Sequence, residues 1–115
     1  MRTPRKSISA LFAGATLAVL APGALAQAVP GNAEAGKNKI AMCIGCHGIP
    51  GYRTAYPEVY HVPKIYGQQE AYIVKALQGY KTGERSHPSM RGIARGLTDA
   101  DMADIAAYYG GPHNK

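Results

Sequence analysis

The sequence predicts a small all-α domain, and three observations support this fold class. Three segments combine helix-forming residues with capping or stop signals, at residues 33–42, 69–80 and 99–109. The connecting segment 48–68 has no sustained hydrophobic periodicity, so we expect a long loop without a β-strand there. Short helices in a chain of this size bury a limited core, and a bound group is expected to complete it.

The first predicted helix, residues 33–42, runs directly into Cys43. Asn32 is a suitable N-cap, because its side-chain oxygen can accept a hydrogen bond from a backbone N–H of the first turn. Glu34 then places an acid near the positive end of the helix dipole.

The second predicted helix has one apolar stripe. Its apolar side chains recur at i, i+1, i+4, i+5 and i+8, namely Tyr72, Ile73, Ala76, Leu77 and Tyr80. Gly83 is expected to end this helix, since glycine adopts the left-handed conformation of a helix C-terminus.

The third predicted helix has the clearest signals. Thr98 is an N-cap with Asp101 three residues later as its capping partner. Apolar residues follow at i, i+3, i+4 and i+7, namely Met102, Ile105, Ala106 and Tyr109. We therefore expect Met102 to pack in the core.

Residues 1–26 have the pattern of a cleaved secretory signal. Three basic residues within the first six precede an uncharged apolar run at residues 8–21, and Ala24-Leu25-Ala26 offers small residues to a signal peptidase. A transmembrane helix needs about 20 apolar residues, so an uncleaved anchor is the poorer interpretation. We expect cleavage after Ala26, export to the periplasm, and one domain over residues 27–115 without a transmembrane segment.

Charge argues against a nucleic-acid partner. The sequence has 13 Lys+Arg against 7 Asp+Glu, but three of these cations lie in the first six residues. The rest of the chain contains no run of Lys and Arg of the kind that binds nucleic acid.

Both cysteines of the chain lie in one short motif, Met42-Cys43-Ile44-Gly45-Cys46-His47-Gly48. Three chemistries use such a pattern: a thiol redox couple, part of a zinc site, or two thioether anchors for a haem whose iron binds the adjacent imidazole.

Zinc and thiol redox chemistry fit the motif less well. A structural zinc site needs about four ligands, and the motif supplies three at most. A redox C-x-x-C motif belongs at a helix start within a strand-helix-strand unit, whereas this motif follows a predicted helix.

Haem attachment agrees with all of these features. Cysteines three positions apart can form thioethers with two vinyl groups of one porphyrin, and His47 then lies beside the iron as an axial ligand. We therefore expect one haem c, attached through Cys43 and Cys46, to complete the core.

The second axial ligand must reach the opposite haem face. Met90 lies in Ser86–Gly92, which we expect to be an irregular loop between helices, far enough from His47 along the chain. His87 in the same loop is the rival, because an imidazole also binds iron well. Met42 precedes Cys43 on the same side of the haem as His47, so it cannot reach the opposite face.

With these motifs the chain resembles the small mono-haem cytochromes c of class I, particularly the bacterial cytochromes c4, c5 and c553. The resemblance covers about residues 31–110 and rests on GNAEAGKNKIAMCIGCHG, VPKIYGQQEAYIVKAL, GERSHPSM and LTDADMADIAAYYG. It implies the cytochrome c fold, in which three to four short helices surround one covalently attached haem.

The resemblance also implies roles for single residues. It favours Met90 as the iron ligand opposite His47, because similar cytochromes carry their methionine in an equivalent H-P-x-M setting. Pro63 matches the position whose carbonyl accepts a hydrogen bond from the imidazole of the first axial ligand. Gly36 and Tyr109 match the glycine and the aromatic residue at which the first and last helices cross.

Iron with both axial positions held by the protein has no open site for a substrate. The expected function is therefore electron transfer rather than catalysis, from a quinol-oxidising complex or dehydrogenase to a terminal oxidase or reductase. If residues 75–95 frame the haem edge, their basic residues would steer acidic partners, namely Lys75, Lys81, Arg85, Arg91 and Arg95. On charge count alone, a merely solvated loop is an equal interpretation of this segment.

Two other hypotheses stay open. The chain fits a dedicated haem subunit that is permanently bound to a dehydrogenase or oxidase, and the clustered Tyr52, Tyr56 and Tyr60 would then form an apolar contact patch. A ligand-binding or peroxide-reducing haem protein would require Met90 to be absent from the iron or readily displaced.

Overall fold

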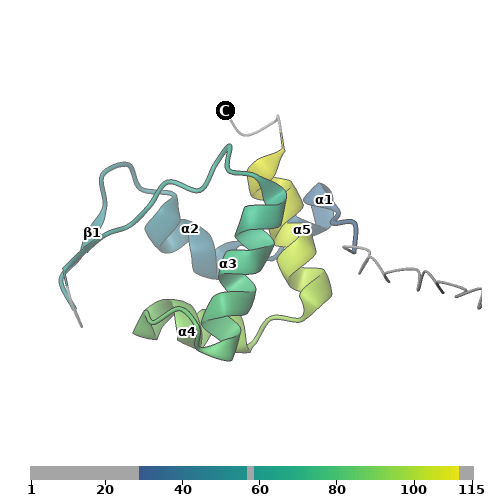
Figure 1. Cartoon of the computed structure of the whole chain (residues 1–115). Coiled ribbons are helices and arrows are strands. Elements are labelled where there is room, and N and C mark those ends of the chain that lie inside the picture. The colour runs from purple at the N-terminus through teal and green to yellow at the C-terminus, as the bar shows by residue number, and fades with distance from the viewer. Residues whose placement is uncertain (1–28, 57–58, 112–115) are drawn as a thin grey trace, which may run out of the picture.

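The structure is a computed structural model that describes residues 29–56 and 59–111. Within these ranges it contains five helices and one pair of short strands (Figure 1). The elements are α1 (Ala33–Lys37), α2 (Ala41–His47), β1 (Arg53–Thr54), β2 (Tyr60–His61), α3 (Glu70–Thr82), α4 (Pro88–Arg95) and α5 (Asp99–Gly110). The predicted signal segment lies outside the described residues.

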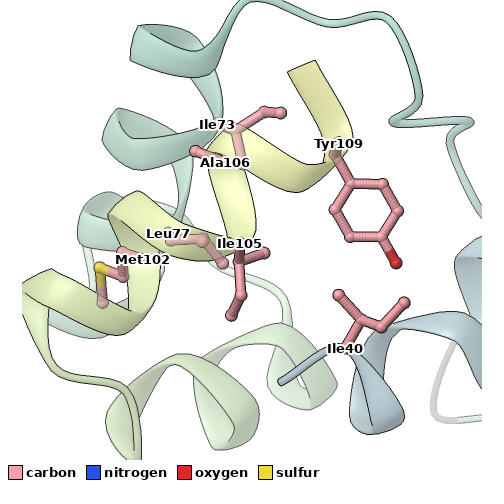
Figure 2. Close-up of a cluster of buried hydrophobic side chains, with 7 residues drawn as sticks. All are labelled: Ile40, Ile73, Leu77, Met102, Ile105, Ala106 and Tyr109. Atoms are coloured by element: carbon pink, nitrogen blue, oxygen red, sulfur yellow. The ribbon is translucent and has the colours of Figure 1, made fainter. Parts of the chain in front are cut away.

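The core forms where helices pack on α5. Both α1 and α3 lie against α5, and α4 packs on α3 (Figure 1). Seven buried side chains make one cluster, shown in Figure 2: Ile40, Ile73, Leu77, Met102, Ile105, Ala106 and Tyr109. The side chain of Met102 is fully buried, so its predicted place in the core is confirmed.

The predicted helix caps are also confirmed. The Asn32 side chain accepts a hydrogen bond from the backbone N–H of Ala35. Thr98 and Asp101 form a reciprocal capping box at the start of α5. Gly83 ends α3 with a φ of 92°, in the left-handed region where a residue with a Cβ is strained.

The prediction of one helix over 33–42 is wrong, because the chain forms two helices there. The backbone N–H groups of Asn38 and Lys39 donate three residues back, to Ala35 and Gly36, and α1 ends. The turn buries Ile40, which is 7% exposed, and α2 then continues to His47. Tertiary packing outweighs helix propensity at this turn.

The prediction of a loop without strands over 48–68 is also wrong. The strands β1 and β2 pair antiparallel, with Arg53 opposite His61 and Thr54 opposite Tyr60. Strands of two residues are too short to show an alternating pattern in the sequence. No helix in the described part of the chain is long and apolar enough to span a bilayer.

Close packing of α1 on α5 depends on a glycine. A Cβ at Gly36 would overlap the backbone oxygen of Asp104 and lie 2.9 Å from the Cβ of Tyr108. The expected crossing of Gly36 with Tyr109 is therefore corrected to Tyr108, while Tyr109 points into the core (Figure 2).

Charged groups tie the turn between α1 and α2 to α5. Lys39 Nζ lies 2.7 Å from both Asp101 Oδ1 and Asp104 Oδ2. Asp104 Oδ1 also accepts a hydrogen bond from the backbone N–H of Asn32, at 2.7 Å. The hydrogen bonds from Lys39 hold the pKa of both carboxyl groups below their usual range.

Candidate functional site

Helix α2 presents Cys43, Cys46 and His47 to one cavity. Residues at positions i, i+3 and i+4 share a helix face, so the motif spacing places all three side chains together. They are half-buried and line a cavity of about 410 Å³. Pockets for small molecules and cofactors are typically about 300–1,000 Å³ in volume.

The apolar stripe predicted on the second helix forms another wall. Its members on α3 all line this cavity: Tyr72, Ile73, Ala76, Leu77 and Tyr80. Ile105 of α5, a member of the core cluster, also lines the cavity. So do three residues of the β1–β2 pair, namely Thr54, Tyr60 and His61. The amphipathic helix therefore faces both the core and the cavity.

A carbonyl group orients the imidazole of His47. Its Nδ1 lies 2.7 Å from the backbone oxygen of Pro63. A carbonyl oxygen only accepts hydrogen bonds, so Nδ1 carries the proton and donates it. The Nε2 atom of the neutral ring then keeps its lone pair for a ligand in the cavity.

Met90 lies in a helix, and the expected irregular loop at 86–92 is wrong. Helix α4 begins with His87 as N-cap and Pro88 in its first turn. Proline is well suited to the first helical position, but histidine is not among the preferred N-cap residues, so the sequence hides this start. The half-buried Met90 lines the cavity and packs against the core cluster.

His87 acts as a helix cap, although it also lines the cavity. Its Nδ1 accepts a hydrogen bond from the backbone N–H of Met90, at 3.4 Å. The proton of a neutral ring then sits on Nε2, and this tautomer offers iron no lone pair. The ring also packs on Tyr60, with centroids 4.8 Å apart.

The environment of the cysteines disfavours a thiol redox couple and a zinc site. Both thiols are free, and burial raises the pKa of the Cys43 thiol, whereas redox-active and metal-bound cysteines need a lowered pKa. Within residues 29–56 and 59–111, no three His, Cys, Asp or Glu side chains are grouped to hold a metal ion.

The cavity therefore suits a haem in its donor set and in its polarity. Two thiols and one free imidazole nitrogen lie on α2, a thioether lies on α4, and apolar side chains of α3 line the space between. These are the groups that covalent attachment and axial ligation of a haem require.

Little in the sequence indicates that Arg85 belongs to the site. Of the five basic residues predicted to steer partners, Arg85 is the one that lines the cavity. Lys81 instead donates a hydrogen bond to the backbone oxygen of Leu97, at 2.5 Å. A charged residue between two helices carries no periodic signal that would separate a site position from a solvated one.

Comparison with known proteins identifies the family. The family model for cytochrome c matches residues 33–109. The chain therefore belongs to the cytochrome c family, as its motifs predicted.

Several relatives are cytochromes of bacterial origin. The chain is 42% identical over 79 residues to cytochrome c4 of Pseudomonas aeruginosa, covering 69% of this chain and 37% of that protein. It is 40% identical over 82 residues to cytochrome c-554(548) of Halomonas halodenitrificans, covering 69% of this chain and 94% of the relative. The cytochrome subunit of sulfide dehydrogenase of Chlorobaculum tepidum is 32% identical over 100 residues, covering 87% of this chain and 86% of that protein.

A solved structure supports the same fold. Reduced recombinant cytochrome c4 from Pseudomonas stutzeri matches with a TM-score of 0.57 and 39% identity, covering 70% of this chain and 45% of that chain. The present chain thus spans less than half the length of these two cytochromes c4. As a member of the cytochrome c family, this domain carries one haem c with iron, held through two thioethers.

Proposed function

We propose that the protein is a periplasmic electron carrier whose haem is bound by Cys43 and Cys46 through thioethers. His47 and Met90 are the proposed axial ligands of the iron. The single observation that carries this proposal is the cavity lined by all four side chains, beside a His47 imidazole whose Nδ1 is already bound to Pro63. Haem c, when bound, supplies a one-electron Fe(III)/Fe(II) couple.

Pro63, His47 and Met90 are proposed to hold the haem iron in place and to set its reduction potential. The Pro63 carbonyl fixes the ring of His47 and increases the basicity of Nε2. Met90 offers a soft thioether, and histidine–methionine ligation raises a haem's reduction potential. Because both axial positions are then held by the chain, no position is left for a substrate, and we propose electron transfer without catalysis.

The apolar walls keep water away from the proposed centre. Ile73 and Leu77 are buried and Ala76 is half-buried, all on the face of α3 that lines the cavity. A hydrophobic shell controls solvent access and the local dielectric, and hence the reduction potential. The donor is proposed to be a quinol-oxidising complex or dehydrogenase, and the acceptor a terminal oxidase or reductase.

The assignment of Met90 is tested with Met90→Ala in protein matured in a periplasm that contains haem-attachment machinery. We expect the ferric protein to lose the weak far-red absorption band of iron–sulfur ligation and its low-spin character. The reduced variant should gain carbon monoxide binding, because the sixth iron position is then open. An unchanged spectrum without carbon monoxide binding would contradict the assignment.

Two matched variants keep that test specific. Met102→Leu removes another thioether from the fully buried core at nearly constant volume, and should leave the far-red band in place. His87→Ala removes the rival ligand and should also keep the band, although the N-cap of α4 is lost. An unmodified ferric protein that is low-spin without the band, and that loses its low-spin character in His87→Ala but not in Met90→Ala, would transfer the ligand role to His87.

A permanently bound haem subunit is the second candidate. A relative that aligns over most of both chains is named as the cytochrome subunit of a sulfide dehydrogenase. Tyr56 and Val59 near the β1–β2 pair are 87% and 65% exposed, which gives an apolar surface for a lasting contact. Gentle purification from the native source separates the candidates, since a carrier elutes alone and a subunit elutes with a larger redox protein.

A further inference from the structure

Helix α4, which carries Met90, has a weak start. It has eight residues, and short helices are marginal in water without tertiary support. The hydrogen bond from the Met90 backbone N–H to Nδ1 of the N-cap His87 is long, at 3.4 Å. The buried residue of α4 is Ala94, in its last turn. The first turn, with Met90, therefore depends on contacts made at its own end.

The β1–β2 pair supplies a contact at this end. The ring of Tyr60 lies against that of His87, with centroids 4.8 Å apart and an interplanar angle of 56°. Aromatic rings attract each other at centroid separations of about 4.5–7 Å. Tyr60 is 40% exposed, so the contact lies at the rim of the cavity that both residues line.

Hydrogen bonds within the strand pair hold the backbone of Tyr60. Its N–H donates to Thr54 Oγ1 at 3.3 Å, and Thr54 is also its partner in the antiparallel register. One step further along, the backbone N–H of Val62 donates to the backbone oxygen of Tyr52, at 2.9 Å. The strand pair therefore presents the ring of Tyr60 to α4 from a defined position.

The contact of Tyr60 with His87 joins two walls of one cavity. Thr54, Tyr60 and His61 line it from the strand pair, while His87 and Met90 line it from α4. The imidazole of His87 contacts Tyr60 and also accepts the hydrogen bond from the Met90 backbone. A displacement of this imidazole therefore also disturbs the first turn of α4.

We propose that Tyr60 is a positioning residue for Met90 and acts through His87. The inference rests on the proposed function, in which Met90 binds the iron. The contact between the two rings favours the capped form of α4, in which Met90 lines the cavity, over forms in which Met90 has left the iron. Loss of the contact therefore raises the fraction of protein with an open iron position.

The experiment titrates the ferric haem-loaded protein with imidazole and, separately, with cyanide at neutral pH. Loss of the far-red band reports displacement of Met90, and the apparent affinity of each ligand is proportional to the open fraction. In Tyr60→Ala we expect both ligands to bind about 2- to 10-fold more tightly, which corresponds to about 0.4–1.4 kcal/mol and to the usual strength of an aromatic pair. The factor should be equal for both ligands, because a wider cavity would favour the larger imidazole.

Matched variants keep the test specific. Tyr60→Phe keeps the ring and should bind both ligands as the unmodified protein does. Tyr56→Ala removes a tyrosine that is 87% exposed from the same connection, and should leave both affinities unchanged. In a His87→Ala background, the further change Tyr60→Ala should have no effect, because the pairwise coupling is already lost. If Tyr60→Ala does not mature, Tyr60→Leu takes its place, since leucine has bulk but no aromatic ring.

Affinities in Tyr60→Ala that equal those of the unmodified protein overturn this inference. The same increase with and without His87, an increase for one ligand alone, or a Tyr60→Phe variant that behaves like Tyr60→Ala overturns it as well. Each of these results leaves the proposed function intact. Failure of the proposed function has a different signature, because the unmodified ferric protein would then lack covalent haem or the far-red band.

Discussion

Gly36 shows how one missing side chain positions two helices. Because Gly36 has no Cβ, α1 can approach the backbone of α5 at Asp104, and a Cβ at this position would displace one of the two helices. The resulting contact places the following turn so that Ile40 enters the core.

We expect Gly36→Ala to lower the free energy of unfolding of the haem-loaded protein by about 1–3 kcal/mol, the usual cost of overpacking. Urea unfolding monitored by circular dichroism measures this change. Gly92→Ala is the matched control, since a Cβ at this site in α4 meets no atom within 4 Å. That variant should be neutral or more stable by roughly 0.5–1 kcal/mol, because alanine favours a helix. Equal stabilities of the two variants would contradict the role of Gly36.

Residue roles were predictable where the chemistry is local. Cys43, Cys46 and His47 stand out because their spacing alone matches haem attachment. The contact of Pro63 with His47 was expected from the family resemblance alone, since a proline 16 positions along the chain carries no sign of its carbonyl's direction. The position of Arg85 on the cavity wall was not predicted, because its stacking on Tyr72 and Tyr80 depends on how the chain leaves α3.

At the scale of elements, an ion-pair group joins the turn after α1 to α5. In the folded protein the pKa values of Asp101 and Asp104 lie below their usual range, while that of Lys39 is raised. The unfolded chain therefore binds more protons than the folded one in mildly acidic solution. The stability from these carboxylates is present above their unfolded pKa and is lost as pH falls toward the folded values.

Lys39→Gln should accordingly lower the melting temperature most clearly above about pH 5. The difference from the unmodified protein should shrink as pH falls below about 4, near the pKa of an unperturbed aspartate. It should also shrink at high salt, because all three groups are exposed enough to be screened. Melting curves from pH 3 to 8 test this, and a difference that is constant across the series would show that the pairs do not contribute.

Elements were predictable from the sequence when both their start and their interior carry a signal. The capping box at Thr98 and the stripe of α3 are of this kind, and both match the structure. The break after Lys37 was not predictable, because it depends on the burial of Ile40. The start of α4 at His87 was not predictable either, because histidine is an unusual N-cap residue. Strands β1 and β2 are too short for an alternating pattern of apolar residues to be visible in the sequence.

For the whole molecule, the cavity explains why so small a core suffices. The buried cluster belongs mainly to α3 and α5, while α2 and α4 face the cavity with the proposed haem ligands. A haem in this position would complete the contacts between these helices, as the shortage of core residues predicted. Fold and cofactor were therefore predictable together, from the attachment motif and the small size of the domain.

The most direct test of the central claim is the intact mass of the protein matured in a periplasm that attaches haem, measured under denaturing conditions. We predict the mass of residues 27–115 plus one haem, and no bound haem when both Cys43 and Cys46 are replaced by serine. A chain that loses its haem in denaturing solvent, or that never carried one, would contradict covalent attachment at this motif and with it the proposed electron carrier.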